Sequence, residues 1–194
     1  GPPKVILRLD IENDDGAWTQ IVSDDSWRMA PGPITFSCTY GGEDYDARRE
    51  RLGWDRPGFD DSAWEAAGIV EGPGGQLRAQ SAPPIKVMQT FERVRITEPK
   101  PGVYVFDLGQ NFSGRPRIAV TGPAGTSVRL TPAELLTEQG LADQGASGGP
   151  SFFSYTLRGS GVEVWHPRFT YYGFRYVQVE GATLAEAMAG LERR

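Results

Sequence analysis

Frequent turn residues constrain this sequence more than any other feature. The chain of 194 residues contains 25 glycines and 15 prolines, well above a usual combined share of about 12%. Between these turns lie short runs in which apolar and polar residues alternate, the period of a β-strand. The runs cover residues 4–11, 18–22, 33–40, 85–96, 103–108, 116–120, 127–130, 152–157, 163–165 and 169–180. Many short strands with regular turns predict an all-β sandwich or barrel.

The two ends of the chain depart from this pattern. Gly1-Pro2 without an initiator Met is typical of a cleaved tag, and we assign residues 1–3 to such a remnant. Thr183 and Glu186 have capping-box spacing in an Ala-rich run, which predicts a short C-terminal helix over residues 182–194. We interpret it as a linker toward a further domain. Residues 4–181 are then predicted to form one module.

Composition excludes several functions. The net charge of −5 with no basic cluster argues against nucleic acid as a partner. No apolar run approaches the roughly 20 residues of a membrane span. Cys38 is the only cysteine, so it forms no internal disulfide and is predicted to be a small buried hydrophobe. His166 is the only histidine and precedes a proline in a strand-like run, which does not favour a triad or a zinc site.

The segment over residues 41–50, GGEDYDARRE, is the densest in chemically active side chains. We predict a long polar loop from 41 to 57 that includes Trp54. Carboxylates and main-chain carbonyls are calcium ligands, and an aromatic ring beside planar polar groups suits a sugar. In the alternative, Arg48 or Arg49 pairs with Asp46 or Glu50 in a network that pins the loop. The residues alone leave both interpretations open.

Two further segments are candidates for ligand contact. Asp107, Gly109 and Asn111 share one face of a predicted strand, where they could bind a sugar or satisfy buried backbone groups. Residues 165–177 hold six aromatic rings and predict a core strand, although exposed rings in it could stack on a ligand.

The ordered motifs of the chain carry a family resemblance. They are Gly42-Glu43-x-Tyr45-Asp46-Ala47-Arg48, Gly53-Trp54-Asp55-x-Pro57-Gly58-Phe59-Asp60-Asp61-Ser62-x-Trp64, Asp107-x-Gly109-Gln110-Asn111-x-x-Gly114, Ala133-Glu134 and Trp165-x-Pro167-x-Phe169-Thr170-Tyr171-x-Gly173-Phe174-Arg175-Tyr176. Together they resemble the N-terminal region of bacterial α-L-rhamnosidases, glycoside hydrolase family 78. The resemblance runs from about residue 23 to residue 181.

The resemblance implies a β-jelly-roll similar to galactose-binding domains and to carbohydrate-binding module family 67. Such modules bind terminal L-rhamnose or a rhamnose-containing glycan with the help of calcium. Catalysis in that family belongs to an (α/α)₆ barrel that follows this region, so this chain is expected to be non-catalytic. The resemblance also implies a secreted or extracellular bacterial protein.

The residues expected to form the site follow from the same resemblance. Relatives often read Asp-Gly-Glu, or a similar acidic or amide pair, where this chain has Gly41-Gly42-Glu43. Either Glu43, Asp44 or main-chain carbonyls supply the calcium ligands instead, or the site does not bind calcium. In the alternative interpretation, the domain packs on the catalytic barrel of the same polypeptide and binds no sugar. The expected sugar-binding residues are Gly42, Glu43, Tyr45, Asp46, Trp54 and Asn111, and the expected metal-binding residues are Gly41, Gly42, Glu43 and Asp44.

Overall fold

The chain divides into two compact units in a computed structural model that describes residues 3–72 and 74–181. The N-terminal unit comprises Gly1–Pro31 and Arg51–Lys86, and the sheet unit comprises Gly32–Glu50 and Val87–Arg194. The chain passes from the N-terminal unit into the sheet unit, back into the N-terminal unit and again into the sheet unit. The single module over residues 4–181 stays a prediction. The predicted helix over residues 182–194 lies outside the described residues.

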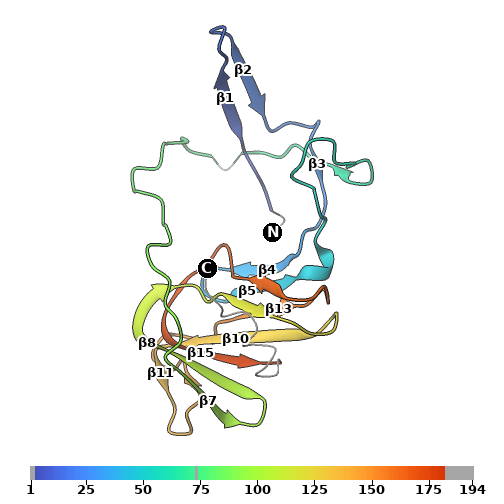
Figure 1. Cartoon of the computed structure of the whole chain (residues 1–194). Coiled ribbons are helices and arrows are strands. Elements are labelled where there is room, and N and C mark those ends of the chain that lie inside the picture. The colour runs from blue at the N-terminus through green and yellow to red at the C-terminus, as the bar shows by residue number, and fades with distance from the viewer. Residues whose placement is uncertain (1–2, 73, 182–194) are drawn as a thin grey trace. The chain divides into compact units, whose positions relative to one another are not determined.

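The sheet unit is built around a seven-stranded sheet with the order β4-β5-β13-β10-β15-β8-β7 (Figure 1). All pairings in it are antiparallel except the parallel pairing of β13 with β5. The remaining strands of this unit form two-stranded pairs, β9 with β14 and β11 with β12. The strands are β4 (Ile34–Cys38), β5 (Gly42–Asp46), β7 (Arg95–Lys100), β8 (Val103–Gly114), β9 (Ile118–Val120), β10 (Ser127–Ala133), β11 (Leu135–Leu136), β12 (Ala142–Asp143), β13 (Phe152–Thr156), β14 (Glu163–Trp165) and β15 (Tyr172–Glu180).

The core forms where alternate side chains of the large sheet meet the β9–β14 pair. In β13, Phe153 and Tyr155 are buried while their neighbours on the other face are only half-buried, as the two-residue period of a strand requires. Trp165 of β14 stacks on Tyr155 with ring centroids 5.4 Å apart, and Tyr155 stacks on Tyr45 of β5. The prediction of an all-β sandwich is therefore confirmed, with aromatic rings joining its layers.

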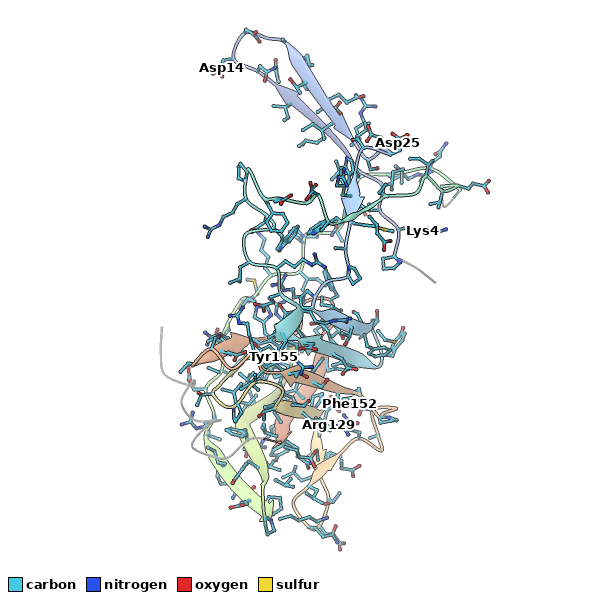
Figure 2. The ribbon with its side chains drawn as sticks, turned by 90° about the vertical axis from the view of Figure 1, so that its right-hand side faces the viewer. Lys4, Asp14, Asp25, Arg129, Phe152 and Tyr155 are labelled. Carbon is cyan, nitrogen blue, oxygen red and sulfur yellow. The ribbon has the colours of Figure 1, made fainter. Side chains whose placement is uncertain are left out.

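A cation–π contact lies on the opposite face of the sheet. The guanidinium of Arg129 on β10 lies 3.9 Å from the centroid of the Phe152 ring on β13, and Figure 2 labels both residues and Tyr155. Phe152 and Tyr155 are an odd number of residues apart, so they point to opposite faces. The contact covers an aromatic ring that the core does not reach.

The N-terminal unit consists of two small strand pairs joined by turns. The antiparallel hairpin of β1 (Arg8–Glu12) and β2 (Trp18–Val22) pairs Leu9 with Ile21 (Figure 1). The other pair is β3 (Arg28–Met29) with β6 (Glu65–Ala66). Within residues 3–72 and 74–181 no helix is long and apolar enough to cross a membrane.

Three sequence expectations differ from the structure. Residues 42–46 were expected in a loop but form the strand β5 inside the large sheet. The strand expected over residues 85–96 begins only at Arg95. Cys38 was expected to be buried and is exposed, because it ends β4, the edge strand of the sheet.

Gly42 explains why a charged segment can enter the sheet. Its φ of 110° lies in a region that side chains avoid, and a Cβ at this position would overlap the backbone carbonyl oxygen of Phe152 on β13. The missing side chain therefore lets β5 approach β13 closely enough for the parallel pairing from Gly42 to Asp46.

We predict that Gly42→Ala lowers the free energy of unfolding by at least about 2 kcal/mol, because it adds an overlap to an unfavourable φ. Gly102→Ala is the matched control, since Gly102 has a φ of 75° with open space where a Cβ would stand, and its cost should be about 1 kcal/mol. Urea unfolding measures both. Equal costs at the two positions would contradict the close approach of β5 and β13.

Candidate functional site

Glu43 is fully buried on β5. Its Oε2 accepts hydrogen bonds from the backbone N–H groups of Arg168 at 3.1 Å and Phe169 at 3.3 Å. A buried carboxylate is stable only when it is well hydrogen-bonded, and these amides supply the bonds. Glu43 therefore anchors the turn that precedes β15.

Tyr45 is also buried, and its hydroxyl donates to Glu50 Oε1 at 2.8 Å. Glu50 Oε2 in turn accepts from Arg158 Nη1 at 2.8 Å. Burial, together with the Glu50 carboxylate, raises the pKa of Tyr45 well above its usual value. The ring belongs to the core and offers no face to a sugar.

The two aspartates of β5 are engaged as well. Asp44 Oδ1 accepts from the hydroxyl of Ser154 on the adjacent β13. Asp46 precedes the short 3₁₀ helix Ala47–Arg49 and binds both the backbone and the guanidinium of Arg48. The Arg48 hydrogen bond holds the pKa of Asp46 below its usual value. The Arg–carboxylate alternative is confirmed for the pair of Arg48 with Asp46.

The segment over residues 41–44 offers few oxygens to a metal. Calcium takes six to eight oxygen ligands, whereas both oxygens of Glu43 accept from backbone amides and one oxygen of Asp44 accepts from Ser154. The backbone from Gly42 to Asp44 is paired with β4 and β13. Among residues 3–72 and 74–181 no three His, Cys, Asp or Glu side chains are grouped to hold a metal ion. The residues do not fit a calcium ion at this position, and the calcium prediction itself stays a prediction.

The other two expected sugar-binding residues are exposed. Trp54 is 61% exposed in the N-terminal unit. Asn111 is exposed on β8 in the sheet unit, where its Nδ2 donates to Glu134 Oε1 at 3.1 Å. The expected set is therefore divided between a buried strand, a second unit and a different strand.

Asp107, on the same strand as Asn111, has a structural partner. Its carboxylate makes two hydrogen bonds to the Arg175 guanidinium, at 2.8 and 2.9 Å, and accepts from the backbone N–H of Gly109. The Arg175 hydrogen bonds hold the pKa of Asp107 below its usual value. Of the two roles considered for Asp107, the bond to Gly109 matches the one in which it satisfies a backbone group, and the pairing with the Arg175 side chain, which joins β8 and β15, was not anticipated.

A cavity of about 440 Å³ lies at the end of the sheet where β13 and β15 begin. Three aromatic side chains on its lining are strongly exposed, 85% for Tyr40, 69% for Phe169 and 56% for Tyr171, whereas Tyr172 is half-buried. Hydroxyl and backbone groups make up most of the remaining lining, and no lining side chain carries a formal charge. The lining residues are Thr39, Tyr40, Ser147, Gly148, Gly149, Ser151, Phe169, Thr170, Tyr171, Tyr172 and Gly173.

Hydrogen bonds from neighbouring residues fix the walls of this cavity. The Thr170 hydroxyl donates to the backbone oxygen of Thr39 at 3.2 Å, which ties the β15 side to the β4–β5 turn. Gln144 Nε2 donates to the backbone oxygens of Pro132 and Ser151, both at 2.7 Å. The buried Glu43 carboxylate accepts a hydrogen bond from the backbone N–H of Phe169. The buried acid expected to bind ligand thus shapes the cavity without lining it.

Only some of these cavity residues were ligand candidates from the sequence. The aromatic run over 165–177 was considered for ligand stacking, and it contributes Phe169 and Tyr171. Tyr40 and Ser151 gave no signal, because only the pairing of β4, β5 and β13 brings them beside the run.

Two family models match successive parts of the chain. Residues 1–89 match the α-L-rhamnosidase N-terminal domain, and residues 97–193 match the bacterial α-L-rhamnosidase concanavalin-like domain. The chain belongs to the bacterial α-L-rhamnosidase family. The boundary between the two domain matches falls after the point where the chain returns to the sheet unit.

Two curated α-L-rhamnosidases align with nearly all of this rhamnosidase-family chain. One from Streptomyces avermitilis is 44% identical over 92% of the chain, and one from Formosa agariphila is 33% identical over 94%. The chain spans only 18% and 20% of their lengths.

Solved structures of the family superpose well. An α-L-rhamnosidase from Dictyoglumus thermophilum gives a TM-score of 0.87 at 41% identity over 93% of this chain and 21% of its own. The S. avermitilis enzyme complexed with L-rhamnose gives 0.87 at 43% identity over 92% of this chain and 18% of its own. The fold and the family are thus shown by independent comparisons.

We predict that Asp107→Asn lowers the free energy of unfolding at pH 7 by about 1.5–3 kcal/mol, because it weakens a charged hydrogen-bond pair. The pKa of Asp107 is lowered in the folded state. The stabilisation from the Asp107–Arg175 pair is therefore complete at a pH above 3.8, the ordinary pKa of an aspartate. It is lost as the pH falls through the lowered pKa of Asp107 in the folded state.

Urea unfolding of both proteins between pH 7 and pH 2 measures this. The difference between wild type and Asp107→Asn should shrink toward zero at the acid end. Glu92→Gln, at an exposed position of the same unit, should stay within about 0.5 kcal/mol of wild type. A difference for Asp107→Asn that is independent of pH would rule out the charged pair as its source.

Proposed function

We propose that this chain is a non-catalytic, carbohydrate-binding part of an α-L-rhamnosidase, and that it binds L-rhamnose or a rhamnose-containing glycan in the cavity at the end of the sheet. The observation that carries the proposal is the chemistry of that cavity, where exposed aromatic rings surround hydroxyl and backbone groups without any formal charge. The family assignment supports the sugar named, since a 43% identical relative is complexed with L-rhamnose.

The lining matches what a neutral sugar needs. A pyranose ring presents apolar C–H faces, which pack on aromatic rings such as Phe169 and Tyr171. Its hydroxyls both donate and accept. In the lining, the Ser147 and Thr170 hydroxyls donate to backbone oxygens and can still accept, and the Ser151 hydroxyl can donate. The cavity volume of about 440 Å³ is within the range of small-molecule sites, about 300–1,000 Å³.

Support for a non-catalytic role comes from the carboxylates. Glycoside hydrolysis uses two carboxyl groups that face the scissile bond, and the cavity lining contains no Asp or Glu. The buried acids of the described residues are engaged: Glu43 by backbone amides, Asp107 by Arg175, and Glu163 by Tyr155 and three backbone amides. We assign bond cleavage to the part of the relatives beyond the fifth of their length that this chain spans.

A second candidate function is docking onto the rest of a longer rhamnosidase polypeptide. It is favoured by the number of large apolar side chains that stand in solvent, among them Trp18, Leu52 and Leu77 in the N-terminal unit at 65%, 77% and 75% exposure. Exposed apolar side chains that adjoin one another mark interaction sites. The two functions are compatible, because these three side chains do not line the cavity.

We predict that calorimetric titration with L-rhamnose gives measurable binding, and that Phe169→Ala weakens it about tenfold because a stacking ring is lost. Phe169 is 69% exposed, so the unfolding midpoint should not change. The control is Val162→Ala, at a residue 58% exposed outside the cavity, with unchanged affinity. Absence of heat at millimolar sugar would reject the proposal, and wild-type affinity in Phe169→Ala would reject the cavity as the site.

The same titration tests calcium. Because no carboxylate lines the cavity, we expect equal affinity for L-rhamnose in excess calcium and in excess chelator. Loss of binding in chelator would instead support the calcium-assisted site that the sequence predicted.

A further inference from the structure

Three residues far apart in the sequence meet beside the cavity. Strands β10 and β8 flank β15 on its two sides (Figure 1), so Glu134, which follows β10, and Asn111 on β8 approach Gly173 near the start of β15. Asn111 Nδ2 donates to Glu134 Oε1 at 3.1 Å. Gly173 lines the cavity, and a Cβ placed on it would be 2.8 Å from the same Glu134 oxygen.

The position of Gly173 shows how close the carboxylate comes. Gly173 does not have a positive φ, so its backbone conformation does not require a glycine. What a side chain would meet is the Glu134 carboxylate. Glycine at this position therefore leaves space between a cavity-lining backbone and a charged acceptor.

We infer that Asn111 and Glu134, which lie outside the cavity lining but next to Gly173, extend the site at this edge and bind neighbouring hydroxyls of the sugar. The inference rests on the proposed function, and it adds the residues that would select among sugars. A carboxylate is a strong acceptor for two hydroxyls, and an amide both donates and accepts. The Asn111 bond occupies one oxygen of Glu134 and orients the other, while the Asn111 Oδ1 still has acceptor capacity.

The surroundings favour ligand contact over a structural role. Both side chains are exposed, and exposed polar pairs contribute little to stability. In the described part of the chain no Lys, Arg or His nitrogen lies within ion-pair distance of Glu134, and the neighbouring Arg175 is paired with Asp107. The Glu134 carboxylate oxygens thus retain acceptor capacity toward the solvent beside the cavity.

The test is L-rhamnose titration of the whole chain carrying Glu134→Gln or Asn111→Ala. Glu134→Gln should weaken binding about tenfold or more, because bonds to a charged acceptor are lost, and Asn111→Ala should weaken it a few-fold. The matched control is Glu138→Gln, which removes the same charge from an exposed residue four positions away outside the cavity lining and should leave the affinity unchanged. Unfolding midpoints of all three variants should equal that of wild type.

The role in selection is tested with monodeoxy analogues of L-rhamnose. If Glu134 binds two hydroxyls, the analogue lacking one of them should bind wild type weakly and should lose little more in Glu134→Gln. Wild-type affinity in Glu134→Gln, while Phe169→Ala weakens binding, would overturn this inference and leave the proposed function standing. Absence of rhamnose binding in wild type would overturn both.

Discussion

The buried carboxylate of Glu43 is the interaction on which the organisation of the sheet unit depends. A charge with no solvent contact needs dedicated hydrogen bonds, and here they come from the backbone amides of Arg168 and Phe169, about 125 residues away in sequence. The bond links β5 to the turn that leads into β15. Since β15 is paired on both sides, one carboxylate helps to position the two halves of the sheet unit.

The cavity is a consequence of this link. The turn held by Glu43 carries Phe169 and Thr170 to the β4–β5 turn, where Thr170 bonds to Thr39. Gly42 allows β5 to pair closely with β13, which sets Ser151 at the opposite wall. Gly42 and Glu43, which the family resemblance suggested as direct ligands, thus position the backbone that surrounds the cavity.

Much of the fold could be predicted from the sequence, and the exceptions have physical causes. Alternating apolar residues identified Phe152–Thr156, which contributes to the core, and Trp18–Val22, an exposed strand of the N-terminal unit. β5 escaped prediction because its sequence GEDYD has one large apolar residue, and it is a strand through its pairing with β4 and β13. The site was harder to predict, since the meeting of Asn111 with Glu134 depends on β8 and β10 lying on either side of β15. Sequence spacing carries no information on that order.

The central claim is that a neutral sugar occupies the cavity at the end of the sheet. Amide chemical-shift mapping of the chain during titration with L-rhamnose tests it most directly. We predict saturable amide chemical-shift changes at Tyr40, at residues 169–173 and at Glu134, with smaller changes along β5. Shifts centred on residues 41–46 and Trp54 with the cavity residues unmoved, or no shifts at all, would contradict it.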